Sequence, residues 1–468
     1  MVDQADMTGT RADAAFRDAD GAVRSEFIDR VREAIDRGDA AALQALVGDL
    51  HEADTGDLIE ALDAESRPRL IELLGGKFDF TALTEVEDAI REDILEELLP
   101  KTVADGVRDL DSDDAAHILG DLPRREQTEI LEQIPPPERS AVERILRYPE
   151  ESAGRRMQTE FIAVPPSWNV GDAIDHMRET ADLPERFFEL YVVDEGRKLL
   201  GVVALDRLLR TKRPVPVADL MDPDRRRVRA NEDQEAVARM FERYNLVAAP
   251  VVDDGERLVG VLTFDDIVDV IEEEAEEDIR ALGGVIRDEE LADSVWKVAR
   301  GRFNWLLVNL ATAFLASSVL GFFEGSLEKM VALAVLAPIV ASQGGNATTQ
   351  TMTVAVRALA TRELTDANVR RVILRELLVG MVNGLAFAVI TGVAAWAWFK
   401  VPGLGVVIAL AMMCNMVAAA LGGILIPLGL NRLRVDPAVA SSPFVTTVTD
   451  VVGFFSFLAI ATLWFGLK

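Results

Sequence analysis

The pattern of hydrophobic and polar positions changes twice along the chain. From residue 25 to 148, apolar residues recur every three or four positions, which predicts amphipathic helices. From 149 to 272, short apolar runs typical of strands alternate with helical stretches. From 301 to 468, five apolar stretches are each long enough to cross a bilayer as helices, for which roughly 20 residues suffice. Residues 1–24 show no periodicity, and we expect them to form a disordered leader.

The fold class expected from this pattern is multidomain: an all-α N-terminal domain, an α/β domain and an all-α membrane domain of five transmembrane helices. In the first domain, the residues after Leu62 resemble those after Leu122, an offset of 60, which predicts stacked helix pairs in a short superhelical arrangement. Its helices begin at acidic positions such as Asp113 and Asp114. Acidic side chains stabilise the positive end of a helix dipole, so helix capping is the plain interpretation of these two residues.

Two segments of the α/β domain repeat one another. The stretch from Leu190 to Val203 reappears from Ala249 to Leu262, an offset of 59, and each copy is typical of two strands joined by a tight turn. Both copies resemble the CBS domain. We therefore expect a tandem CBS pair, or Bateman domain, with units at 149–211 and 212–272.

The CBS resemblance also implies a candidate nucleotide site. In that family, a Thr followed three residues later by an Asp contacts a nucleotide ribose. Thr263 and Asp266 fit this pattern in the second unit, whereas Ala204 and Arg207 stand at the matching positions of the first. An adenine nucleotide such as ATP is therefore a candidate ligand of the second unit.

An acidic run follows the second CBS unit, between residues 265 and 278. Acidic residues three and four positions apart lie on one face of a helix, where unscreened like charges are unfavourable. Such a face is either solvated or neutralised by a divalent cation, since Mg²⁺ and Ca²⁺ take oxygen ligands. Gly283 and Gly284 then break the helix. Another amphipathic helix is expected over 288–299, within a connecting segment at 273–300.

Basic residues orient the five predicted spans. Lys and Arg precede the first span and fill the second and fourth connections, whereas the opposite loops carry only Lys329 and Lys400. By the positive-inside rule, the soluble part is cytoplasmic and the C-terminus is outside a cell (inner) membrane. The spans are expected at about 303–323, 329–356, 372–398, 404–430 and 444–467.

Polar residues interrupt two of these spans. Asp450 is the single acid of the fifth, and an acid inside a membrane is by default a candidate functional residue. Ser442, Thr446 and Thr447 lie on or near its helical face, which gives oxygen ligands suited to a hard cation. The second span holds Pro338 and a polar run over 342–351, which belongs against protein or a water-filled path. The plainer alternatives are a protonated Asp450 that is hydrogen-bonded to a neighbouring helix, and close helix packing through small residues.

Charge divides the chain at the membrane. Residues 300–468 hold seven acidic and twelve basic side chains, a net charge of +5, and the remaining 72 acidic and 37 basic side chains give the first part −35. Such an acidic surface disfavours nucleic acid and can hold cations. The first residues lack the pattern of a secretory signal peptide. The single cysteine, Cys414, excludes a disulfide framework, and the three histidines have no Ser or Cys partner in view, so we do not expect an enzyme.

Taken together, these segments resemble the MgtE family of magnesium channels. The motifs are LAPIVASQGGNATTQTMTVAVRALATREL at 336–364 and DPAVASSPFVTTVTDVVG at 436–453, joined to the CBS pair, the acidic helical domain and the five spans. The resemblance implies a homodimer whose second and fifth spans line a pore, with Mg²⁺ as substrate and regulator. The implied pore residues are Asp450, Gly344, Gly345, Asn346, Thr446, Ser442 and, near the outer mouth, Glu324. The implied cytosolic sensor comprises Asp266, Asp269, Glu274, Glu277 and Asp278, with Asp113 and Asp114 of the helical domain.

The resemblance implies import of Mg²⁺ down its gradient through a pore that cytosolic Mg²⁺ closes. With Mg²⁺ bound between the acidic domains, the helix over 288–299 is held as a plug against the inner mouth; without it, the acids repel and the mouth opens. Two alternatives remain open from the residues. One is a proton- or sodium-coupled divalent cation transporter, and the other is a membrane-anchored nucleotide sensor without transport.

Overall fold

The computed structural model describes residues 16–180, 183–184, 186–285, 289, 292–365, 367–435 and 437–467, without the side chains of 439–442. The chain forms two compact units: residues 1–274 with 290–292, and residues 275–289 with 293–468. The first unit contains the predicted helical domain and CBS pair, and the second contains the predicted membrane domain. The predicted multidomain fold class is confirmed.

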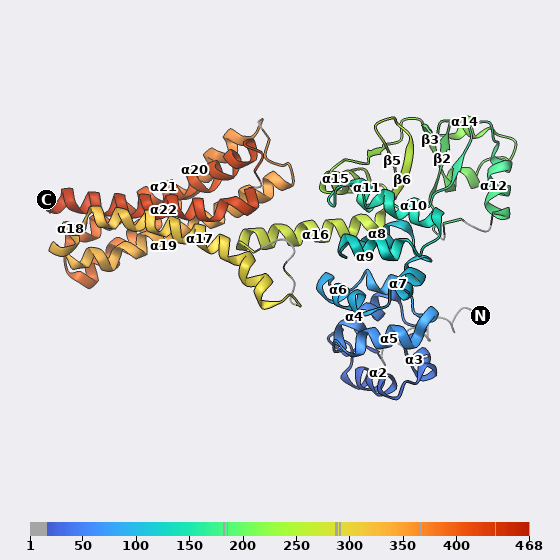
Figure 1. Ribbon diagram of the computed structural model, residues 1–468. Helices are drawn as coiled ribbons and strands as arrows, with labels where there is room; N and C mark the ends of the chain where they lie inside the picture. Colours follow the sequence, from blue (N-terminus) through green and yellow to red (C-terminus); the bar gives the residue numbers. More distant parts are fainter. Residues whose placement is uncertain are drawn as a thin grey trace. The chain divides into compact units, whose positions relative to one another are not determined.

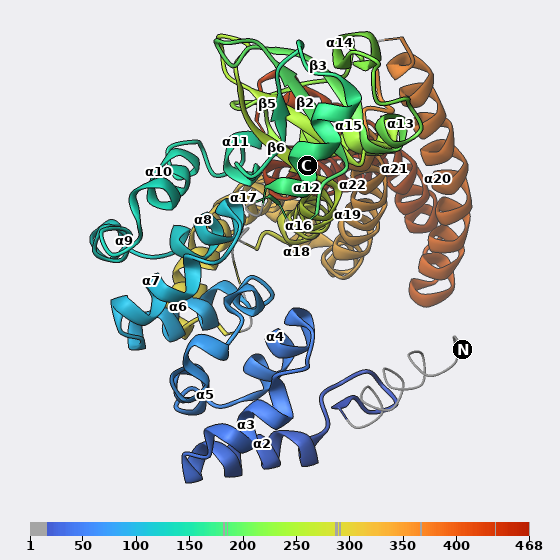
Figure 2. The same cartoon turned by 90° about the vertical axis from the view of Figure 1, so that its right-hand side faces the viewer.

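Short helices stack in succession through the N-terminal part of the first unit (Figures 1 and 2). Local signals set their ends: the Asp39 carboxylate accepts a hydrogen bond from the Ala42 amide at 3.0 Å, and Gly38 ends the first helix with φ of 65°. The helices are α2 (Ser25–Arg37), α3 (Ala40–Val47), α4 (Glu52–Ala61), α5 (Ser66–Leu74), α6 (Asp88–Glu97), α7 (Pro100–Val107), α8 (Ser112–Gly120), α9 (Arg124–Leu131) and α10 (Pro136–Ile145), with 3-10 turns η1 (Gly75–Lys77) and η2 (Phe80–Leu83).

The predicted disordered leader is too long. Residues 1–15 lie outside the described residues, but Phe16 is buried, and its ring meets that of Phe27 edge to face at 5.1 Å. Arg17 forms ion pairs with Asp54 and Asp57 on α4. The end of the leader is therefore part of the folded helical domain. The prediction missed it because Phe16 packs against Phe27, a contact that the spacing of apolar residues in the sequence does not reveal.

The CBS pair consists of two small three-stranded sheets of the same topology. In each, the first strand runs parallel to the second, which pairs antiparallel with the third; Tyr191 lies opposite Val202, and Pro250 lies opposite Val261. The elements of the first repeat are α11 (Ala153–Arg156), β1 (Ala163–Val164), α12 (Val170–Glu179), β2 (Glu189–Val193), β3 (Leu199–Ala204) and α13 (Leu205–Leu209). Those of the second are α14 (Val217–Leu220), β4 (Val228–Arg229), α15 (Gln234–Tyr244), β5 (Ala248–Val252), β6 (Leu258–Thr263) and α16 (Phe264–Gly283).

The hairpins explain why the repeat is visible in the sequence. The carboxylates of Asp194 and Asp253 each accept hydrogen bonds from backbone amides two and four residues later, at 2.8–2.9 Å. Positive φ falls on Arg197 (63°) and Glu256 (62°), one residue after the glycine of each turn. Identical turn chemistry therefore stands at positions 59 residues apart, and the predicted internal repeat is confirmed.

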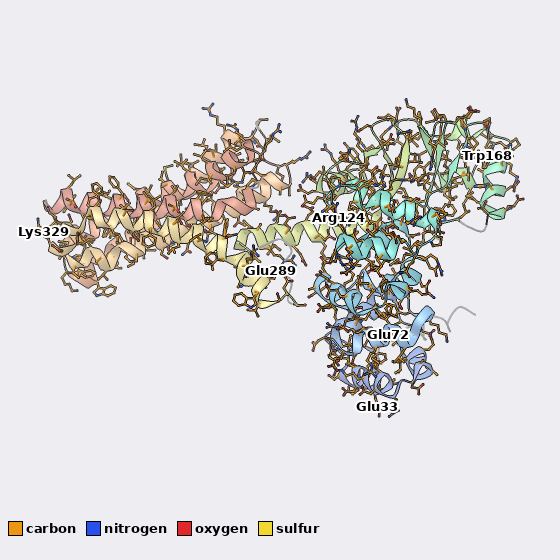
Figure 3. All side chains as sticks on the ribbon, in the orientation of Figure 1. Glu33, Glu72, Arg124, Trp168, Glu289 and Lys329 are labelled. Atoms are coloured by element: carbon orange, nitrogen blue, oxygen red, sulfur yellow. The ribbon has the colours of Figure 1, made fainter. Side chains whose placement is uncertain are left out.

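Among its described residues, the second unit contains five helices that are long and apolar enough to cross a membrane. In the helix Pro402–Arg432, 56% of the most apolar 18-residue stretch is buried within the structure, whereas in the helix Val295–Phe322 the figure is 6%. Lys329 and Glu289 are at opposite ends of this unit (Figure 3). The helices are α17 (Val295–Phe322), the short α18 (Glu324–Lys329), α19 (Val331–Ala360), α20 (Val369–Phe399), α21 (Pro402–Arg432) and α22 (Pro437–Phe465).

The connecting segment differs from the expectation. Helix α16 follows β6 directly and continues to Gly283, so it begins nine residues before the predicted connecting segment. Asp288 lies outside the described residues. Residues 295–299 belong to the first membrane helix, because α17 begins after Ser294, whose hydroxyl accepts a hydrogen bond from the Lys297 amide, and it is unbroken to Phe322.

Candidate functional site

An acidic cleft of about 1,170 Å³ lies within the first unit. It is bounded by the start of α8 on one side and by the end of β6 and the start of α16 on the other. The cleft takes its charge from at least six elements and loops rather than from a single motif. Its acidic lining residues are Glu52, Asp79, Glu85, Asp105, Asp109, Asp111, Asp113, Asp114, Asp265, Asp266 and Asp269.

Helix geometry positions the principal acids. Asp113 and Asp114 lie in the first turn of α8, and Ser112 beside them is held by Glu160, whose carboxylate accepts from its hydroxyl at 2.8 Å. Asp266 lies in the first turn of α16 and accepts hydrogen bonds from both the hydroxyl and the amide of Thr263, the latter at 3.3 Å. The cleft thus brings together acids that are about 150 residues apart in the sequence.

Burial and mutual repulsion raise the pKa values of these carboxyl groups. Desolvation, with repulsion from neighbouring acids, raises the pKa of Asp114 and that of Asp266 to about 7. The same causes raise the pKa of Asp269 to about 6, and that of Asp113 well above its ordinary value, with Asp266 as its largest charged neighbour. The cleft therefore resists full ionisation at neutral pH unless cations enter it.

The cleft contains some of the predicted sensor residues but not all. Asp113, Asp114, Asp266 and Asp269 line it together. Glu274 instead accepts a hydrogen bond from the Gln234 side chain at 2.7 Å. Glu277 and Asp278 follow on α16 within the second unit. Thr263, proposed for nucleotide binding, also lines the acidic cleft.

Sequence reasoning missed several acids of the cleft. Glu52 is the first residue of α4, and Glu85 lies in the loop before α6. At such positions an acid is usually an ordinary cap or surface residue, so neither indicated a site in the sequence. Burial raises the pKa of Glu85, and Glu52 adds repulsion. Asp265 adjoins a predicted residue, so the acidic run itself was the signal that could have included it.

The candidate pore residues lie on three helices of the second unit. Asp450 is partly exposed on α22, and Thr446 lies one turn earlier, its hydroxyl donating to the Pro443 carbonyl at 3.2 Å. Ser442 is also in α22, but its side chain lies outside the described residues. Glu324 is exposed at the start of α18.

Helix α19 passes through the glycine pair without a break. Gly344 is buried, Gly345 has open space around its α-carbon, and Asn346 is exposed. One stripe of this helix presents polar side chains at the surface of the unit. Its exposed members are Ser342, Asn346, Thr349, Gln350 and Thr353.

A smaller cavity of about 140 Å³ lies between α19, α20 and α21. Gln350, Glu376 and Asn383 contribute its polar lining, and the Arg375 guanidinium donates to Oε1 of Glu376 at 2.8 Å. Among the described residues of both units, no three His, Cys, Asp or Glu side chains form a group that could hold a metal ion directly.

Family comparisons cover most of the chain. Residues 337–460 match the MgtE family of divalent cation transporters, residues 50–151 match the MgtE intracellular N domain, and residues 153–213 and 217–273 match the CBS domain. The CBS matches cover the two sheets, whereas the N-domain match begins just before α4 and the MgtE match begins within α19 and ends within α22.

Individual relatives agree with the family matches. The magnesium transporter MgtE of Enterococcus faecalis is 35% identical over 67% of this chain and 69% of that protein, and that of Thermus thermophilus is 38% identical over 66% and 69%. A crystal structure of the cytosolic domain of the Mg²⁺ channel MgtE in complex with ATP is 32% identical over 52% of this chain and 99% of that chain, with a TM-score of 0.48. The chain belongs to the MgtE family of magnesium transporters.

Proposed function

We propose that this chain forms a magnesium-selective channel of the cytoplasmic membrane, which imports Mg²⁺ down its electrochemical gradient and closes when cytosolic Mg²⁺ binds in the acidic cleft. The observation that carries the proposal is the polar stripe of α19, from Ser342 to Thr353, which no other described part of the unit covers. Polar side chains in hydrocarbon are costly, so the stripe belongs beside water or a second copy of the chain.

A homodimer would give this stripe a water-filled path. Helix α22 packs along α19 and carries Asp450 partly exposed, so two copies would place two carboxylates beside one passage. Mg²⁺ loses its water reluctantly, and a wide site with doubled negative charge suits an ion that keeps its hydration shell. Monovalent ions gain less from the doubled charge. We place the N-terminus in the cytoplasm and the C-terminus outside, from the basic residues between the spans.

Helix α16 offers a mechanical route from the cleft to the membrane. Its first turns carry Asp266 and Asp269, and its last turn carries Ala281, which is buried against Met352 of α19 and Val445 of α22. A helix of 20 residues is about 30 Å long, and we propose that it carries movement from its first turns to its last. In our proposal, repulsion between the cleft acids displaces the start of α16 when Mg²⁺ is scarce, and bound Mg²⁺ returns it to the closed state.

Mg²⁺ fits the cleft better than a nucleotide does. Asp266 accepts a hydrogen bond from Thr263, the other residue of the ribose-binding pattern, but a polyphosphate there would meet the like charges of Asp113 and Asp114. We therefore propose Mg²⁺ as the regulatory ligand of this cleft. Saturable binding of ATP to the Mg²⁺-free wild type in calorimetry, lost in Thr263→Val, would contradict this choice.

The decisive experiment measures Mg²⁺ flux into liposomes that contain the purified full chain. We expect Asp450→Ala to abolish flux while the protein retains its melting temperature and inserts normally. Normal flux through this variant would remove the pore assignment. Reversal potentials that follow the pH or sodium gradient would instead identify a coupled transporter.

The sensor is tested in patch recordings with millimolar Mg²⁺ on the cytosolic face. We expect the triple variant Asp113→Asn, Asp114→Asn and Asp266→Asn to stay open where the wild type closes. A matched control removes three exposed acids outside the cleft, Glu195→Gln, Asp206→Asn and Glu242→Gln, and should close normally. Equal inhibition of the triple variant and the wild type would refute regulation through the cleft.

A further inference from the structure

Asn415 is a fully buried polar residue in the middle of α21, the central membrane helix. Its Nδ2 donates a hydrogen bond to the Val340 carbonyl of α19 at 2.7 Å. Its Oδ1 is buried and has no hydrogen-bond partner among the described residues. A buried oxygen without a partner costs stability, so packing alone does not explain an amide at this position.

Two glycines from two other helices meet at this amide. A β-carbon on Gly344 of α19 would lie 2.0 Å from Asn415 Nδ2, and a β-carbon on Gly453 of α22 would lie 2.8 Å from the same atom. Contacts this short are essentially never seen for real β-carbons. Helices α19 and α22 therefore each approach the Asn415 side chain at a glycine, where no β-carbon intervenes.

The positions of the two glycines connect this contact to the ion pathway. Gly344 begins the glycine-glycine-asparagine run that ends at Asn346, and Gly453 lies one turn after Asp450. A residue in contact with both helices sets the distance between them and their rotation. Side chains that must surround an ion are sensitive to such placement at the level of about 1 Å.

We propose that Asn415 is a positioning residue, whose amide holds α19 and α22 at the separation that lets Asp450 and Asn346 discriminate Mg²⁺ from larger divalent ions. It does not touch the ion. The hydrogen bond to Val340 fixes the amide on α19, and the contact with Gly453 fixes α22 against it. This role rests on the proposed channel function.

The first test compares Mg²⁺ with Ca²⁺ flux in liposomes. Asn415→Ala should lower the ratio of Mg²⁺ to Ca²⁺ flux by about tenfold or more, while some Mg²⁺ flux remains. Asn415→Leu keeps a similar volume but has no donor for the Val340 carbonyl, and it should show the same loss. Unchanged selectivity in both variants would overturn the proposal.

The second test uses suppression. Gly344→Ala should lower flux and melting temperature, and the double variant Gly344→Ala with Asn415→Ala should recover melting temperature because the obstructing amide is gone. Gly423→Ala is a matched control: its β-carbon would lie 2.8 Å from Thr351, so Asn415→Ala should not rescue it. Gly429→Ala, on the same helix as Asn415 with open space around it, should change nothing.

The two readouts separate the two proposals. Failure of suppression in the melting temperature would overturn the positioning contact even if the wild type conducts Mg²⁺. A wild type that conducts no divalent ion would overturn the channel function, and with it the role of Asn415 in selectivity, whatever the melting temperatures show.

Discussion

Mg²⁺ binding in the acidic cleft should depend steeply on pH. The pKa values of Asp114 and Asp266 are raised to about 7, chiefly by burial. A carboxyl group of pKa 7 is about 10% ionised at pH 6 and about 90% ionised at pH 8. If Mg²⁺ needs both groups ionised, its apparent affinity should fall on the order of 50- to 100-fold from pH 8 to pH 6.

The same groups set the sign of the stability change without Mg²⁺. Their pKa values in the folded protein lie above the ordinary value of 3.8, so the folded state holds protons that the unfolded state has released. Their contribution to stability is present at low pH and is lost as the pH rises through about 7. Between pH 6 and pH 8, the free energy of unfolding should fall by about 1 kcal/mol per group, allowing for their partial exposure.

Titration calorimetry of the purified full chain measures the Mg²⁺ affinity, and thermal melting of the Mg²⁺-free protein measures the change in stability. Mg²⁺ is titrated at pH 6, 7 and 8 in buffers of different ionisation enthalpy, which counts the protons released on binding. Asp114→Asn with Asp266→Asn should flatten the pH dependence and raise the melting temperature of the Mg²⁺-free protein at pH 8. The reasoning would be refuted by equal dissociation constants at pH 6 and pH 8, or by binding without proton release.

Three further variants test the supporting structure. Arg91→Met should lower the free energy of unfolding by about 1–3 kcal/mol in urea titrations, because the buried guanidinium that donates to the Leu83 and Val86 carbonyls is lost and those carbonyls are left without a donor; Arg91→Lys should lose less. Arg225→Met should destabilise the CBS pair by a similar mechanism, seen as a lower melting temperature, since it removes the partner of a buried glutamate on β2. Gly284→Ala should lower the melting temperature and shift tryptophan fluorescence, because φ is +71° and a β-carbon would lie 1.8 Å from Trp305 Nε1. An unchanged melting temperature in any one of them would contradict the contact concerned.

Local chemistry made much of the fold predictable from the sequence. Each CBS hairpin is encoded by its own Asp-x-Gly turn, as at Asp194 and Asp253, so the repeat needs no tertiary information. The membrane helices follow from length and hydropathy in the same way. The burial of Phe16 was not predicted, because it depends on a contact with Phe27 that no periodic pattern in the sequence indicates.

The candidate sites were predictable only where chemistry and sequence proximity coincide. Asp266 and Asp269 belong to a visible acidic run, and Asp450 is a solitary acid in an apolar helix. Glu52 and Glu85 reach the cleft through the packing of distant helices, so their spacing carries no signal. In the sequence, Asn415 is a single amide residue within an apolar stretch. Its candidate role becomes visible only from its close approach to Gly344 and Gly453 in the structure.

Because α16 is one continuous helix, its length fixes both the distance between its two ends and the directions that they face. One residue inserted into its exposed middle would advance the distal half by about 1.5 Å and turn it by about 100°, so Ala281 would no longer face Met352 and Val445. Seven inserted residues would nearly restore the facing but lengthen the element by about 10 Å. An insertion or deletion in this helix therefore changes its length and the direction that its last turn faces at the same time.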